Sequence, residues 1–121
     1  MMGRVLQWNA HSMNAHGFEF YNNMIKNTGE EDKPSIVCIQ ETWYDEYNNI
    51  IFPDYMLITK NRKDRRGGLA FYVHKSINFQ VLKIPEDREY QIIDIFIKTA
   101  LFDSSICIIL AKKSYLLCWM R

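Results

Sequence analysis

The segment Ser35–Gln40, with the sequence SIVCIQ, constrains the fold of this chain more than any other stretch. Its apolar residues are continuous rather than alternating, and Pro34 precedes it. Continuous apolar strands are typical of sheets that are covered on both faces. Glu41 follows directly, so we expect a carboxylate at the point where a buried strand meets a loop.

The length and composition predict one globular domain that spans residues 1–121. The chain has 121 residues and is 48% hydrophobic, which is typical of a protein that forms a core. Its formal net charge is only +1, so no global field attracts nucleic acid, and any basic surface must be local.

The cysteines and the hydropathy pattern indicate an intracellular protein, either nuclear or cytoplasmic. Cys38, Cys107 and Cys118 show no paired spacing, which favours free thiols in a reducing compartment. No segment approaches the roughly 18 apolar residues that a membrane helix needs, and the N-terminus has no apolar core of a signal peptide. We therefore expect no membrane partner.

The residue patterns predict seven strands around one main helix. The apolar residues between Ala15 and Ile25 recur at spacings of three and four, which predicts an amphipathic helix that closes at Gly29. The predicted strands lie at residues 4–10, 35–40, 55–60, 68–74, 79–84, 90–98 and 104–111. This order predicts an α/β fold with a mixed sheet, whose later part is antiparallel.

Polar residues follow the first two predicted strands. Asn9 ends the first strand and Glu41 follows the second. If these strands pair in parallel through the helix, both residues emerge at the same rim, where ligands of α/β sheets gather. The alternative is that Asn9 forms a turn and Glu41 is a solvated loop residue, and the residues alone leave both interpretations open.

The segment Lys60–Gly68 concentrates positive charge before two glycines. Its candidate nucleic-acid-binding residues are Arg62, Lys63, Arg65 and Arg66. Such a loop can neutralise several phosphates, although a solvated hairpin connection explains the same charges. His11 and His16 follow Asn9 closely and are interpreted as loop residues without a catalytic role.

Four motifs together resemble the endonuclease/exonuclease/phosphatase superfamily, in particular the apurinic-type endonuclease domain of non-LTR retrotransposons. The motifs are LQWNA, IVCIQETW, FPDY and RRGGLAFYVHKSI, and the similarity covers residues 4–109. The resemblance implies the N-terminal half of a four-layered α/β sandwich of the DNase I-like type. It also implies cleavage of DNA phosphodiesters with Mg²⁺ or Mn²⁺. By that resemblance Glu41 binds the metal ion and Asn9 lies beside the scissile phosphate.

The sequence departs from the family pattern in its last part. The family's Asp-x-Asn motif, further metal-binding aspartate and Ser-Asp-His motif are absent, and residues 110–121, LAKKSYLLCWMR, diverge. We therefore expect a truncated domain that holds its metal ion weakly, if at all, and is inactive as a fragment. We also expect a missing second sheet and self-association through the exposed sheet faces. The alternatives are a non-catalytic nucleic-acid-binding remnant and a relative of the phosphatases or lipid phosphodiesterases.

Overall fold

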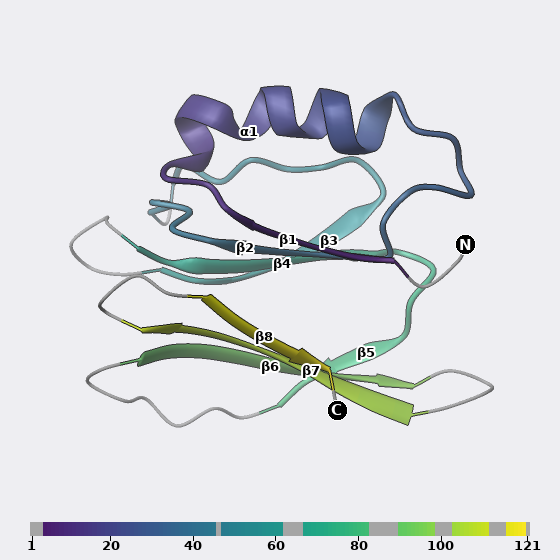
Figure 1. The fold of residues 1–121 in the computed structure, drawn as a ribbon, viewed down its shortest axis with the longest axis vertical. Coiled ribbons are helices and arrows are strands. Elements are labelled where there is room, and N and C mark those ends of the chain that lie inside the picture. Colours follow the sequence, from purple (N-terminus) through teal and green to yellow (C-terminus); the bar gives the residue numbers. More distant parts are fainter. Residues whose placement is uncertain are drawn as a thin grey trace.

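The protein has three layers in this computed structural model: a helix, a four-stranded sheet and a second four-stranded sheet (Figure 1). The structure describes residues 4–45, 47–61, 67–82, 90–98, 103–111 and 116–120, with side-chain surroundings for the first three ranges and for residues 95–97. No helix in these ranges is long and apolar enough to cross a membrane.

The first sheet is mixed, and one of its two central strands is formed by the residues IVCIQ of the segment SIVCIQ. Its order is β1 (Val5–Asn9), β2 (Ile36–Gln40), β4 (Leu69–His74) and β3 (Tyr55–Lys60). β1 and β2 are parallel, whereas β4 is antiparallel to both β2 and β3. Every residue of β2 is buried, which confirms the prediction of a strand covered on both faces.

The helical segment covers one face of this sheet. α1 (Met13–Tyr21) continues into η1 (Asn22–Lys26), a single π-helical turn. The predicted helix at residues 15–25 is therefore confirmed, but its last turn is wider, because the Asn27 N–H donates to the Asn22 carbonyl 3.2 Å away. The core on this face is formed by the buried residues Ala10, Met13, Ile25, Val37, Ile39, Tyr44, Phe52, Tyr55, Ala70 and Tyr72.

A second, antiparallel sheet packs against the opposite face of the first (Figure 1). Its strands are β5 (Phe79–Val81), β6 (Tyr90–Lys98), β7 (Asp103–Ala111) and β8 (Leu116–Met120). Among the residues whose side chains the structure describes, the core between the sheets includes Ile36, Cys38, Leu69, Phe71, Val73, Ile95 and Ile97. The expectation of a missing second sheet was wrong. A four-residue connection after β4 leads the chain into β5, the first strand of the second sheet.

The strand β8, within the divergent tail, belongs to this second sheet. β8 pairs with β7 in antiparallel register, with Cys118 opposite Ile108. Sequence reasoning assigned the tail no strand, because it contains none of the usual turn residues. Its apolar run LLCWM nevertheless has a strand-forming composition, and pairing with β7 satisfies main-chain groups on one side of it.

Candidate functional site

Three chain segments meet at the rim of the first sheet where β1 and β2 end, at the left of Figure 1. Asn9 lies opposite Gln40 in the parallel register, so the two strands end side by side. The loop after β1 is bound to the loop after β2 through main-chain hydrogen bonds. The N–H groups of Ala10 and Ser12 donate to the carbonyls of Gln40 and Glu41 at 2.9 and 3.0 Å. The parallel pairing predicted from the sequence is confirmed.

The connection between β3 and β4 belongs to the same rim. Lys60 and Gln40 both pair with Leu69, so β3 ends and β4 begins beside the end of β2. The Trp43 N–H donates to the Gly67 carbonyl at 2.9 Å. Gly67 and Gly68 have φ values of 81° and 91°. Residues that carry a side chain rarely adopt such values, which explains why two glycines occur here.

Backbone strain is concentrated at this rim. Of the five non-glycine residues with positive φ in the part of the chain that the structure describes, four lie here. They are His11 at 44°, Ser12 at 93°, Glu41 at 51° and Trp43 at 55°. Such conformations cost free energy and persist only where surrounding structure holds them, which is often at binding sites.

The side chains of Asn9 and Glu41 converge on His11. Oε2 of Glu41 is buried and lies 2.9 Å from Nδ1 of His11. The backbone N–H of His11 donates to Oδ1 of Asn9 at 3.3 Å. The structure therefore brings the two predicted residues together, and it adds a third that was interpreted as an ordinary loop residue.

His11 could not be found from strand periodicity, since it lies beyond the strand end. Its side chain lies beside Glu41, in a turn where residues 11 and 12 both have positive φ. The one sequence feature that could have indicated a role for His11 was its position two residues after Asn9. His16, by contrast, lies on α1 and lines a groove with Trp8, Glu19 and Phe20, where Trp8 stacks on Phe20 with ring centroids 4.5 Å apart.

Glu41 is the residue at this rim that could hold a divalent cation. Oε2 of Glu41 is buried but accepts no hydrogen bond of acceptable geometry, so this carboxylate has capacity for a cation. Within the described ranges, no cluster of three or more His, Cys, Asp or Glu residues could hold a metal ion. Mg²⁺ and Mn²⁺ sites of phosphoryl-transfer enzymes do not need such a cage, since one or two carboxylates and substrate phosphate suffice.

The four basic candidates, Arg62, Lys63, Arg65 and Arg66, lie outside the described residues. The structure does describe the residues on either side of them, Asn61 and Gly67. Asn61 follows β3 directly, and Gly67 contacts the loop after β2 through Trp43. The basic segment therefore starts and finishes at the same rim as Glu41.

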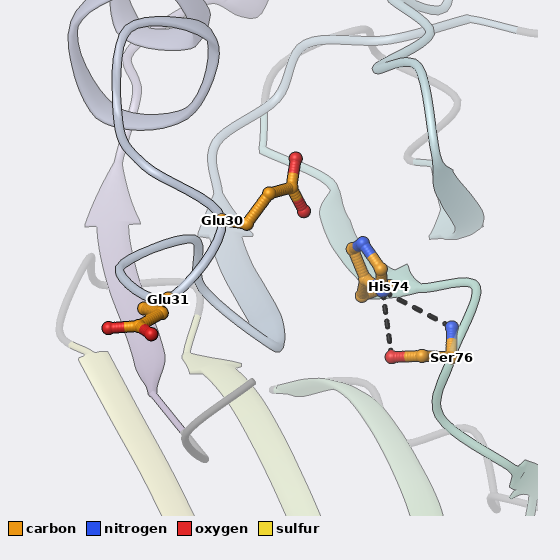
Figure 2. Close-up of a pocket in the computed structure, with 4 residues that line it drawn as sticks. All are labelled: Glu30, Glu31, His74 and Ser76. Carbon is orange, nitrogen blue, oxygen red and sulfur yellow. Dashed lines mark hydrogen bonds between the residues drawn. The ribbon is translucent and has the colours of Figure 1, made fainter.

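A second hollow lies at the other end of the first sheet, where β4 ends (Figure 2). It has a volume of about 300 Å³ and is lined by Glu30, Glu31, His74 and Ser76. Nδ1 of His74 accepts a hydrogen bond from the Ser76 N–H at 3.2 Å and lies 2.8 Å from Oγ of Ser76. Burial lowers the pKa of His74. In Figure 2 the carboxylate of Glu30 points in the direction of His74, whereas that of Glu31 points away from it.

The polar groups of this hollow mainly bind one another and the local turns. Glu30 forms an ion pair with Lys33 at 3.7 Å, and His74 bonds to Ser76. Asp54, with a φ of 70°, lies at the same end of the sheet, but Glu30 and Glu31 are exposed and the hollow has no buried carboxylate, so the rim is the stronger candidate site.

Comparisons with known proteins add no family to this picture. No protein-family model matches the chain, and no curated protein matches it significantly. The motifs and the geometry of the rim are therefore the basis for any assignment of function.

Proposed function

We propose that this chain is a phosphodiesterase-type domain of the DNase I-like kind that binds a divalent cation and DNA phosphate at the rim. One observation carries the proposal: Asn9 and Glu41 leave neighbouring parallel strands at the same rim and converge on His11. This is the arrangement that the resemblance to retrotransposon endonucleases implies for the metal-binding glutamate and the phosphate-contacting asparagine.

Glu41 is the residue that would hold Mg²⁺ or Mn²⁺ at this rim. When bound, such a cation supplies Lewis-acid polarisation of a phosphoryl oxygen. Asn9 orients the phosphate: its Oδ1 accepts from the His11 N–H, which leaves the amide NH₂ group as a donor to a phosphate oxygen. Both contacts are common to every phosphodiester, so they support the class of substrate rather than its sequence.

The basic segment supports DNA as the polymer that carries the phosphodiester. It contains Arg62, Lys63, Arg65 and Arg66, and both of its flanks lie at the rim. Each phosphate that such residues neutralise releases counterions, so the affinity for DNA falls as salt concentration rises.

Binding is expected to exceed cleavage in this chain. The printed 121 residues contain neither the Asp-x-Asn motif nor the Ser-Asp-His motif that the resemblance implies. Catalytic groups act as a unit, so the loss of the general acid and base lowers the rate by several orders of magnitude.

A second candidate is metal-independent DNA binding by the basic segment alone. The observation that favours it is that no cluster of three or more His, Cys, Asp or Glu residues exists within the described ranges, which limits the affinity for a cation. The two candidates differ in whether Mg²⁺ and Glu41 contribute to DNA binding.

The test measures binding of a labelled DNA duplex by fluorescence anisotropy, with and without Mg²⁺. We expect Mg²⁺ to strengthen binding in the wild type and not in Glu41→Gln, while the double variant R65Q/R66Q binds weakly under both conditions. Glu19→Gln, which removes a carboxylate from α1, is the matched control and should resemble the wild type. Mg²⁺-independent binding that is lost in R65Q/R66Q would establish the second candidate, and binding unaffected by either change would refute both.

A further inference from the structure

We propose that His11 is a direct ligand, together with Glu41, of the cation at the rim. The site then prefers first-row transition dications such as Co²⁺ over Mg²⁺. This inference rests on the proposed function, because it concerns the same cation site, and it identifies the class of metal ion that the site takes.

The distance between the two donor atoms fits a shared cation. Nδ1 of His11 lies 2.9 Å from Oε2 of Glu41. Nitrogen and oxygen ligands lie about 2.1 Å from a small dication. Two such ligands at adjacent corners of an octahedron are therefore about 3.0 Å apart.

The orientation of the two groups is not that of a directed hydrogen bond. Despite the short separation, Oε2 of Glu41 accepts no hydrogen bond of acceptable geometry. The in-plane axis of Nδ1, along which either a proton or a lone pair lies, is therefore not aimed at Oε2. A cation shared by two adjacent ligands lies off the line that joins them, so this orientation is compatible with a common cation.

The backbone holds both residues in these positions. His11 has a φ of 44° and Glu41 a φ of 51°. The N–H of His11 is bound to Asn9, and the N–H of Ser12 is bound to the carbonyl of Glu41. The backbones of both residues are thus held next to each other before any ligand arrives, which reduces the free energy needed to order the site.

Access to the pair is from the solvent side. The His11 side chain is 68% exposed, whereas that of Glu41 is 14% exposed. A cation bound by both would keep its other coordination positions for water or phosphate oxygens. Imidazole suits transition metals, whereas carboxylates and water suit Mg²⁺, so the nitrogen ligand determines the preference.

The experiment titrates Co²⁺ and Mg²⁺ into the full chain at one fixed pH by calorimetry, and records the visible absorption of bound Co²⁺. The test variant is His11→Gly, because glycine adopts the positive φ without strain and offers no donor atom. His16→Gly on α1 would break a helix, so His16→Ala is the control for a histidine outside the site. Circular dichroism confirms that each variant is folded.

We expect His11→Gly to weaken Co²⁺ binding at least tenfold and to leave Mg²⁺ binding within twofold, while Glu41→Gln weakens both and His16→Ala changes neither. If His11→Gly leaves Co²⁺ binding within twofold while Glu41→Gln still weakens both ions, His11 is not a ligand, and the proposed cation site survives. If the wild type binds neither ion, both proposals are refuted. Loss of Co²⁺ binding in His16→Ala would also refute the assignment of His11.

Discussion

Gly68 occupies a position beside the rim where no side chain fits. Its φ is +91°, and an added Cβ would lie 2.6 Å from Oγ1 of Thr42. We expect Gly68→Ala to lower the free energy of unfolding by about 1–3 kcal/mol, since strain and steric overlap act together. Urea denaturation measures this. Gly29→Ala is the matched control, because nothing lies within 4 Å of its added Cβ. Equal stability of the two variants would contradict the positive φ of Gly68 and its close approach to Thr42.

Buried tyrosine hydroxyls make the stability depend on alkaline pH. Burial raises the pKa values of Tyr44 and Tyr72, whose hydroxyls are 2.5 Å apart. Burial, with the nearby Glu30 carboxylate, raises the pKa of Tyr55 to about 12. A raised folded-state pKa contributes stability that is complete below the unfolded value near 10 and is lost as pH rises through the folded value.

The contribution of these tyrosines to the free energy of unfolding should therefore be constant up to about pH 10 and fall between about pH 10 and 12. Urea denaturation across this range gives the profile. Tyr55→Phe should flatten part of the fall, and it should also lower stability at neutral pH because the bond to the Pro34 carbonyl at 2.6 Å is lost. Tyr47→Phe, at an exposed tyrosine, is the control. A profile that is flat to pH 12 in the wild type would contradict the burial of these hydroxyls.

At the scale of residues, the sequence located Asn9 and Glu41 because strand ends can be read from apolar runs. It did not locate His11, whose contact with Glu41 is made in a turn where residues 11 and 12 have positive φ values. Local sequence gives little signal for such conformations when the residues are not glycine. The roles of Asn9 and Glu41 remain predictions until a ligand is measured.

At the scale of elements, the strongest patterns were the most informative. The continuous apolar run of β2 predicted burial on both faces, and the three- and four-residue spacing predicted α1. The π-helical turn at Asn22–Lys26 and the strand β8 were not predicted. Both depend on tertiary packing and pairing, which override the local propensities used to read a single sequence.

The packing of β6 on the first sheet can be tested with one substitution. Ile95 is fully buried between the sheets, with 0% of its surface exposed. We expect Ile95→Ala to lower the free energy of unfolding by about 2–5 kcal/mol, through lost burial and the cavity left behind. Val81→Ala in the same sheet is the control, since Val81 is 46% exposed. Chemical denaturation that finds the two variants equally stable would contradict the sandwich.

At the scale of the whole molecule, the first sheet is covered on both faces, by the helix on one side and by β5–β8 on the other (Figure 1). Each end of the first sheet carries a candidate place for a ligand. The rim with Glu41 lies at one end and the hollow beside His74 lies at the other. The length of the first sheet thus separates the two candidate sites.

The central claim is that a cation binds at the rim formed by Asn9 and Glu41. Paramagnetic broadening of backbone amide signals by Mn²⁺ tests it most directly, because the effect falls steeply with distance from the ion. We expect substoichiometric Mn²⁺ to broaden the amides of residues 9–12 and 41–43, to leave residues 74–77 at the opposite end sharp, and to lose this effect in Glu41→Gln. Broadening centred on His74 and Glu30, or a pattern that Glu41→Gln leaves unchanged, would contradict the account.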